Sequence, residues 1–314
     1  MAITQYNLSS PNEDLRLAKM ISQEIKLLLQ DSTNLKNSPF MDFVGSINGK
    51  GSDTIRVRKA GLDGYNQFSA FTGATEDSAV SDTALTDGHA DVVVKRQALA
   101  YAISDLASMT GMGGGDIDPF RIADSIAKSY DSTFAQLTGV TFSAFTTIKG
   151  SAGGSNTVAH LVDAIQALES AASGKGAPGP YVCVLHPKQW ADIQDNILSL
   201  STGVLQFVPA SYEAISAKGS NYKGSFLGVE IYTSSWVAND GVSHFGAMWS
   251  PGAIGFATGM PAGLPGSSEM MEMGEVLVEM DRDATKALTR IVGHAYLGMS
   301  IIDDNRGVVI KGGL

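Results

Sequence analysis

Cysteine is nearly absent from this chain. Cys183 is the only one among the 314 residues, which excludes an intramolecular disulfide and a metal site of the CxxC type. It lies in the apolar run YVCVLH, a position typical of a small buried core residue rather than a reactive thiol. The polar N-terminus MAITQYNLSSPNEDLR lacks the basic and apolar segments of a secretion signal. We therefore expect the protein to be made and kept in a reducing compartment.

Charged residues and uninterrupted apolar segments are scarce as well. Charged residues make up 17% of the chain and the formal net charge is −10, so binding to nucleic acid through a basic surface is not expected. Three prolines interrupt the uncharged run 244–268, and a segment broken in this way is a poor membrane helix. Hydrophobic residues make up 44%, which is typical of a globular core. The composition predicts a soluble protein without a membrane partner.

Patterns typical of catalytic, metal or cofactor sites are also missing. The five histidines show no HxxxH or HxH spacing, and there is no GxSxG nucleophile elbow. GMGGGD at 111–116 lacks the Lys-Ser/Thr pair of a phosphate-binding loop. Asp303, Asp304 and Asn305 lack the other ligand positions of a calcium loop and predict a tight turn. We predict no catalytic residue, no metal, no cofactor and no enzyme activity.

Three segments repeat apolar residues at helical spacing. The first, 11–30, follows a capping box formed by Ser10 and Glu13. The second, 119–138, has Asp118 as N-cap and a proline at the first helical position, and at 1.5 Å per residue it spans about 30 Å. The third is TVAHLVDAIQALESAAS. The 35 glycines predict frequent turns between such elements.

The second half of the chain predicts short strands and one further helix. Strands are expected at PYVCVLH, GVEIYTSS, HFGAMWS and AIGFAT, and a short helix at PKQWADIQDNILS. The tail alternates through EVLVEMD, TKALTRIVGHAYLGMSII and GVVIK. These returns predict one antiparallel sheet against which the long helix packs, and the fold class is α+β.

The segment 63–91 has neither helical nor strand periodicity. It contains six acidic residues and no Lys or Arg. The runs on either side, 52–60 and 91–104, carry basic residues and predict two antiparallel strands of a long hairpin. Because a lone hairpin cannot bury enough surface to be stable in water, either its own chain or another chain must cover it.

The order of these parts resembles the tailed-bacteriophage major capsid protein of the Hong Kong 97 type. YVCVLHPKQWADIQ is similar to the strand and helix of that family's axial domain, and YKGSFLGVEIYTSSWV to its glycine-then-strand segment. The tail VEMDRDATKALTRIVGHAYLGMSIIDDNRGVVIKGGL resembles the family's closing strands. The resemblance implies an N-terminal arm at 1–51, an extended hairpin loop at 52–104, a peripheral domain at 105–154 with its spine helix at 119–138, an axial domain at 155–265, and the C-terminal sheet of the peripheral domain at 266–314.

The resemblance also implies a function and partners. The protein would assemble with itself, through pentamers and hexamers, into an icosahedral shell that encloses double-stranded DNA without sequence-specific binding. It would be a virion head protein assembled in the cytoplasm of a bacterial host, with a portal and a cement or decoration protein as further partners. The loop 63–91 has no Lys for a covalent crosslink, so a non-covalent shell is expected. Only about 50 residues precede the hairpin, so a separate scaffolding protein is expected.

The extended loop would be a subunit interface in such a shell. Acidic residues at its tip and basic residues on its stem would pair between neighbouring subunits and favour one register, and aromatic residues would anchor the tip. The expected interface residues are Arg56, Arg58, Lys59, Lys95 and Arg96 on the stem, Tyr65, Phe68 and Phe71 as anchors, and Glu76, Asp77 and Asp82 as tip acids.

Other classes of protein remain open from the sequence. An encapsulin nanocompartment shares the fold, and its enzyme cargo would distinguish it from a phage head. An α+β enzyme would need a pocket of converging polar groups, and a tail-tube protein would differ in symmetry. Shell size and host are not encoded in any of these patterns.

Overall fold

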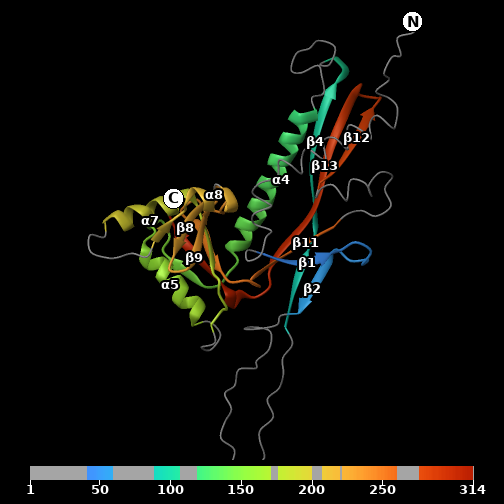
Figure 1. Ribbon diagram of the computed structural model, residues 1–314. Helices are drawn as coiled ribbons and strands as arrows, with labels where there is room; N and C mark the ends of the chain where they lie inside the picture. Colours follow the sequence, from blue (N-terminus) through green and yellow to red (C-terminus); the bar gives the residue numbers. More distant parts are fainter. Residues whose placement is uncertain are drawn as a thin grey trace, which may run out of the picture.

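Two β-sheets and a short hairpin organise the part of the chain that the structure describes. The computed structural model describes residues 41–58, 88–106, 119–170, 176–199, 207–219, 221–259 and 276–313. In Figure 1 one sheet and the shorter helices form a rounded unit on the left. The other sheet and the long helix α4 (Pro119–Phe142) form an elongated unit on the right.

The elongated unit is built on a five-stranded sheet. Its strands are β1 (Asp42–Ser46), β4 (Lys95–Ser104), β11 (Ile254–Thr258), β12 (Leu277–Asp283) and β13 (Leu288–Ile301). β13 is the central strand, because β11 and β12 pair antiparallel with one of its edges and β4 pairs antiparallel with the other. β1 pairs parallel with β11.

Helix α4 lies on one face of this sheet. Its sequence places Ile126, Tyr130 and Phe134 at intervals of four residues, and all three are buried in one core with side chains of β13. The Phe134 ring meets Phe256 of β11 edge-on, with ring centroids 6.4 Å apart. A buried side chain of this size contributes about 1.5–3 kcal/mol, so this apolar stripe holds the helix on the sheet. The helix predicted at 119–138 is confirmed.

The end of α4 reaches the second sheet. The helix continues to Phe142, whose ring lies 4.8 Å from that of Trp249. Gly139 makes this approach possible, because a Cβ there would collide with the carbonyl oxygen of Trp236 and lie 3.0 Å from the amide nitrogen of Ala238. The last turn of α4 therefore joins the two units.

Gly139→Ala is expected to destabilise the protein although alanine favours helices. Alanine gains about 1 kcal/mol over glycine in a helix, but the collision is with backbone atoms that have little room to move. Overpacking typically costs about 1–3 kcal/mol, so we expect a net loss of up to about 2 kcal/mol in the free energy of unfolding, measured by urea denaturation. Val140→Ala, one residue further on the exposed face, is the control and should change little. A more stable Gly139→Ala variant would show that helix propensity outweighs the contact.

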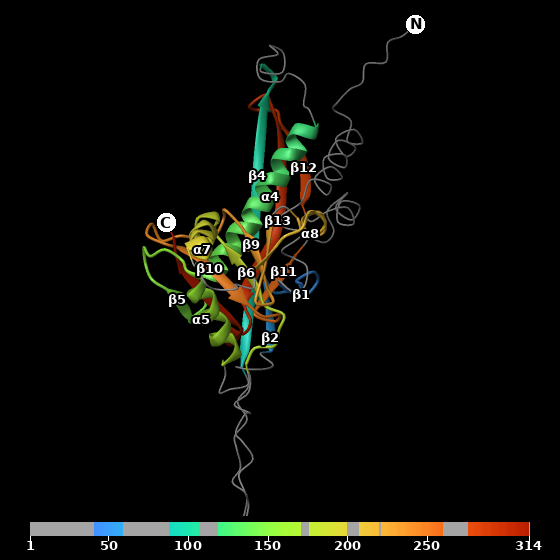
Figure 2. The ribbon, with the colours of Figure 1, turned by 60° about the vertical axis from the view of Figure 1, so that its left-hand side comes forward.

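The rounded unit is built on a seven-stranded sheet with the order β5-β14-β10-β6-β9-β8-β7. Its strands are β5 (Ile148–Gly150), β6 (Val182–Leu185), β7 (Phe207–Pro209), β8 (Tyr222–Phe226), β9 (Val229–Thr233), β10 (His244–Trp249) and β14 (Gly307–Gly312). Its helices are α5 (Val158–Glu169), α7 (Pro187–Ser199) and α8 (Tyr212–Lys218). Figure 2 shows β5 and α8 on opposite sides of this unit.

Both faces of the seven-stranded sheet are covered. The side chains of β6 alternate between two cores: Val182 and Val184 pack in the core shared with α4, and Cys183 and Leu185 pack in the core with α5 and α7. This explains why the strand reads as a continuous apolar run. Cys183 is fully buried, as predicted, and burial raises the pKa of its thiol.

The predicted long hairpin is wrong in its second half. The run 91–104 is not one strand, because it changes partner at Val94. β3 (His89–Val93) pairs with β2 (Thr54–Arg58), whereas β4 pairs with β13. Gly298 of β13 permits this change, because a Cβ there would collide with the carbonyl oxygen of Val93. Pairing with β13 brings alternate side chains of β4 onto the α4 core, which a free hairpin could not offer.

The antiparallel C-terminal sheet expected from the tail is confirmed for two of its strands and wrong for the last one. β12 and β13 form the predicted antiparallel return, but β14 lies in the seven-stranded sheet. Val308 and Ile310 of β14 pack against α5 and α7, and Val309 packs in the other core. Because β14 buries both faces, its side chains are better covered between two layers than at the edge of the five-stranded sheet.

Two further predicted helices and one predicted turn are confirmed, and one predicted helix lies outside the described residues. The helices expected at TVAHLVDAIQALESAAS and PKQWADIQDNILS are α5 and α7, and the turn expected at Asp303 is a 3-10 turn at Asp304–Arg306 in which the Asp303 carboxylate accepts from the amide of Asn305. The helix expected at 11–30 lies outside the described residues.

Candidate assembly surfaces

The hairpin stem carries the first group of predicted interface residues. Arg56 on β2 faces Asp91 on β3, and the guanidinium donates two hydrogen bonds to the carboxylate, at 2.9 and 3.0 Å. The hydrogen bond from Arg56 lowers the pKa of Asp91. The bidentate pair is exposed to solvent, so it adds little stability but holds the two strands in register. Arg58 is exposed opposite His89 on the same stem.

One face of the stem is covered by its own chain. Val92 is fully buried, and Ile55 and Val57 pack beside it in a small core with Ala257 of β11. The stem of the hairpin is therefore covered by β11 of its own chain, which provides the cover that a lone hairpin needs. The remaining loop residues named for the interface lie outside the described residues: Lys59, Tyr65, Phe68, Phe71, Glu76, Asp77 and Asp82.

The last two predicted residues, Lys95 and Arg96, lie at the start of β4 and are exposed. The guanidinium of Arg96 lies 3.1 and 3.3 Å from Nδ1 of His294. Because arginine only donates, Nδ1 accepts, and the protonated Nε2 of His294 lies 3.3 Å from the Glu279 carboxylate. Arg96 is therefore linked, within its own chain, to a polar row across β4, β13 and β12. No spacing in the sequence could have revealed this row, because 198 residues separate Arg96 from His294.

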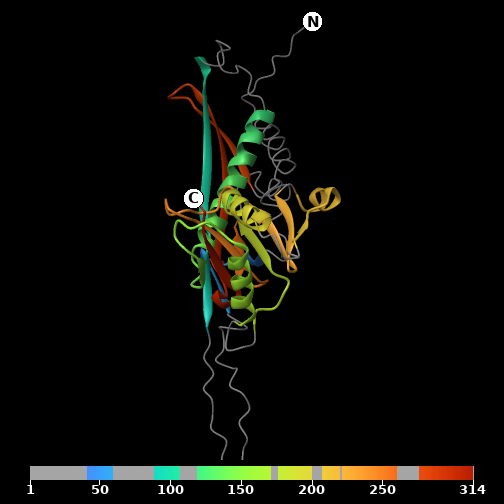
Figure 3. The ribbon, with the colours of Figure 1, turned by 90° about the vertical axis from the view of Figure 1, so that its left-hand side faces the viewer.

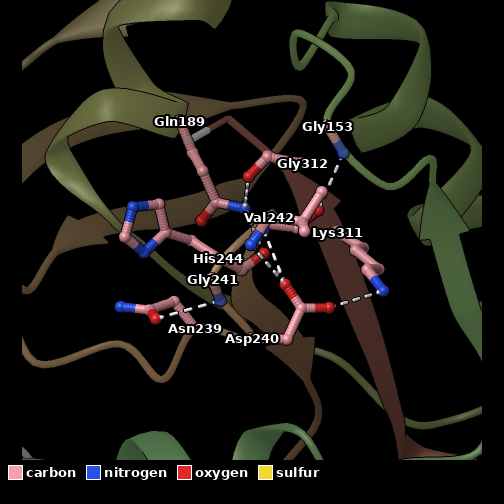
Figure 4. Close-up of polar contacts among 10 residues, drawn as sticks. Gly153, Gln189, Asn239, Asp240, Gly241, Val242, His244, Lys311 and Gly312 are labelled. Carbon is pink, nitrogen blue, oxygen red and sulfur yellow. Dashed lines mark hydrogen bonds and ion pairs between the residues drawn. The ribbon is translucent and has the colours of Figure 1, made fainter.

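A second polar cluster, which the sequence did not reveal, joins three elements of the rounded unit (Figure 4). Gln189, in the first turn of α7, is fully buried. Its amide nitrogen lies 3.0, 2.9 and 3.1 Å from the carbonyl oxygens of His244, Ile310 and Gly312, and its oxygen accepts from the amide of His186. One side chain thus connects α7 to the ends of β10 and β14.

The loop before β10 is held by a charged contact in the same cluster. The Asp240 carboxylate lies 3.0 Å from the Lys311 ammonium and accepts from the amides of Val242 and Ser243. Lys311 is the main reason that the pKa of Asp240 falls to about 2. The Ser243 hydroxyl accepts from the amide of Gly153 at 2.9 Å. Figure 4 shows these contacts converging from separate segments, so this corner of the unit is tightly braced.

Two histidine rings stack beside this cluster. The rings of His186 and His244 are nearly parallel, with centroids 3.6 Å apart. Burial, and for His186 also the charge of its neighbour, lowers the pKa of both. Nδ1 of His244 is buried without a hydrogen-bond partner among the described residues. The neutral form of both rings is therefore favoured in the folded chain.

The histidine pair predicts a loss of stability in mild acid. Both rings have a folded-state pKa below their ordinary value of 6.5, so the unfolded chain binds more protons as the pH falls through that value. Their contribution is complete above about pH 6.5 and declines as the pH falls toward the folded-state pKa values. Urea denaturation between about pH 7 and pH 5 should show a smaller decline for His186→Phe than for the wild type. An unchanged pH profile in this variant would contradict the assignment; His160→Gln, on α5, is the control.

The described residues offer little for other kinds of site. No three His, Cys, Asp or Glu side chains among them are placed to hold a metal ion, and none of their helices is long and apolar enough to cross a membrane. A hollow between α4 and the five-stranded sheet is lined by Leu99, Tyr130 and His294 among others.

A spine helix on a long-stranded sheet, a second sheet between helices and a hairpin stem define the fold of phage capsid proteins, and this chain has that fold. The α+β, Hong Kong 97-like capsid fold predicted from the sequence is confirmed. The sequence itself matches no family model and no curated protein.

The particular similarities are to shells of different origin. The capsid of Ralstonia phage GP4 has a TM-score of 0.57 and 11% identity, with 90% of this chain and 88% of that chain covered. The head of Helicobacter pylori bacteriophage KHP40 has a TM-score of 0.53 and 10% identity, with 99% and 98% covered. The holo-SrpI encapsulin complex of Synechococcus elongatus has a TM-score of 0.53 and 11% identity, with 72% and 77% covered. At these identities the similarity establishes the fold.

Proposed function

We propose that the protein is the major capsid protein of a tailed DNA bacteriophage, which assembles with itself into an icosahedral shell around the genome. The observation that carries the proposal is that the match to phage heads extends over nearly the whole of both chains, rather than over one sheet. A structural role, without enzyme activity, follows from the same proposal.

The domains take their roles from this assignment. The rounded unit would be the axial domain, at about 155–265 with β5 and β14 added and β11 left to the other sheet, and would meet its copies in pentamers and hexamers. The elongated unit with α4 would be the peripheral domain, flanked by the N-terminal arm at 1–51. The braced corner around Gln189 supports the axial role, because subunits that pack around an axis need a rigid contact surface.

The net charge of the chain and the composition of its loop support proposals about what the shell contains and which partners it has. A net charge of −10 suits a container that encloses DNA without holding it, since a wall that bound many phosphates would hinder packing and ejection. The absence of Lys from the loop 63–91 supports a shell without covalent crosslinks. A separate scaffolding protein, a portal and a decoration protein would complete the head in the host cytoplasm.

A second candidate function is an encapsulin-type nanocompartment. The observation that favours it is the encapsulin match, whose TM-score equals that of the KHP40 head although it covers less of the chain. Particles purified from the native source would distinguish the two, because an enzyme cargo favours the compartment and packaged DNA or a portal favours the phage.

The first test is to express the chain alone and to measure its mass by sedimentation, with negative-stain images of the same fraction. Rings or closed shells support a shell protein of either kind. A monomer of 32.9 kDa that persists at high protein concentration and across salt conditions overturns both assignments.

A further inference from the structure

The outer edge of β4 is a long strand edge that pairs with no other strand in the described part of the chain. Among the described residues β4 pairs only with β13, along one side. Figure 3 shows this strand, in teal, running along the margin of the molecule. The backbone groups on its other side have no strand partner in the described part of the chain. β4 has ten residues, whereas the edge strands β5 and β7 of the other sheet have three each.

Beyond Lys95 and Arg96 at its start, β4 lacks the features that usually protect such an edge. Natural edge strands carry charged residues, prolines or bulges, or are very short. The segment 97–103 reads QALAYAI, with no charge and no proline. On the face opposite α4 its exposed side chains are the small ones of Ala98, Ala100 and Ala102. A second strand could therefore approach this edge without steric or electrostatic hindrance.

The two ends of β4 carry opposite charges. Lys95 is the first residue of the strand and is exposed, and Asp105 follows its last residue. Asp105 already pairs with Arg282 at 2.9 Å, but its side chain keeps 29% of its surface exposed, so one carboxylate can accept from a second cation. A strand with a cation at one end and an anion at the other is complementary to an antiparallel copy of itself.

We propose that β4 pairs antiparallel with β4 of a second copy of this chain, centred on Ala100, and so joins the two five-stranded sheets. In this register Lys95 lies opposite Asp105 of the partner subunit, and the same contact occurs twice. A register shifted by two residues would instead place Lys95 opposite Ile103 of the partner subunit. Such an interface is isologous, with one surface used by both subunits about a two-fold axis. The inference rests on the proposed function, since the shell supplies the second copy and its two-fold axes.

A single cysteine tests the register. Directly opposite residues of an antiparallel pair have Cα atoms about 4.5–5.5 Å apart, within the range of about 4.4–6.8 Å that a disulfide needs. Ala100→Cys would face itself across the interface. Ala98→Cys is the matched control on the same face, because it would face Ala102 of the partner subunit and lie roughly 13 Å from its own copy. Cys183 does not compete, because it is fully buried.

Both variants are expressed as full chains, treated with a mild oxidant and analysed by non-reducing gel electrophoresis, sedimentation and electron microscopy. The expected result is assembly of both variants, with covalent dimers in most Ala100→Cys chains and in few Ala98→Cys chains. Equal crosslinking of the two overturns the proposed register. Assembled particles without dimers overturn the β4 contact and leave the shell function standing. Dimers of Ala100→Cys without any larger assembly support the contact and overturn the shell, and neither dimers nor assembly overturns both.

Discussion

Deleting residues 66–88 should leave a subunit that folds but cannot close a shell. The deletion keeps β2 and β3, the strands of the stem, whose apolar face is packed against β11 through Val92 and its neighbours. Both large sheets and both cores lie outside the deleted segment, so the free energy of unfolding should change little. In the proposed shell this loop reaches the neighbouring subunit, and its loss removes a contact that no other part of the chain replaces.

The measurement combines urea denaturation of the subunit with sedimentation and electron microscopy of the assembly. The expected result is a cooperative unfolding transition close to that of the wild type and the absence of closed particles. In a second variant, a Gly/Ser linker of the same length replaces 66–88, which keeps the length of the loop but removes its side chains. This variant should also fail to form closed shells, because it lacks the aromatic anchors and the acids of the loop. Normal shells from the deletion variant would refute the role of the loop.

Gln189→Leu should cause the largest loss of stability among single substitutions considered for this chain. The fully buried amide of Gln189 lies within hydrogen-bonding distance of three carbonyl oxygens, on β10 and β14. Leucine has a similar volume but donates nothing, and a buried polar group left without a partner costs about 1–3 kcal/mol. We expect the free energy of unfolding to fall by about 3–5 kcal/mol, a large fraction of the 5–15 kcal/mol typical of a domain.

Urea denaturation of the purified subunit checks this value. Gln166→Leu, on the exposed face of α5, is the matched control and should change the free energy of unfolding by less than about 0.5 kcal/mol. A loss below about 1 kcal/mol for Gln189→Leu would mean that the carbonyl groups find other donors. Assembly of the variant should fail at temperatures where the wild type assembles, since the brace between α7, β10 and β14 is lost.

Much of the secondary structure could be predicted because its signals are local. The interval of four residues between Ile126, Tyr130 and Phe134 predicts α4, and the run YVCVLH followed by proline predicts β6 and α7. Helical periodicity and helix-start residues act within a few positions of the chain. The ordered set of such elements was also enough to indicate the capsid fold, although the sequence matches no family model.

The pairing of strands depended on contacts between distant segments. β3 and β4 are continuous in the sequence, yet they belong to different sheets because β13 offers β4 a partner and an apolar face shared with α4. β14 follows β13 directly, yet it enters the other sheet because both of its faces can be buried there. Alternation of apolar residues predicts that a strand exists but not which strand lies beside it.

For the polar sites too, one part could be predicted from the sequence and the other depended on contacts between distant segments. The sequence by itself determined the charges that are available: basic residues on the stem, acids in the loop, and an uncharged segment at 97–103 with opposite charges at its ends. Only the tertiary structure decided which groups meet. Arg56 pairs with Asp91, Arg96 contacts His294, and the uncharged Gln189 contacts three backbone carbonyl groups. The physical reason is that a hydrogen bond forms over about 3 Å, whereas sequence patterns report only neighbours along the chain. Folding brings together groups that are far apart in the sequence, such as Arg96 and His294, which are separated by 198 residues.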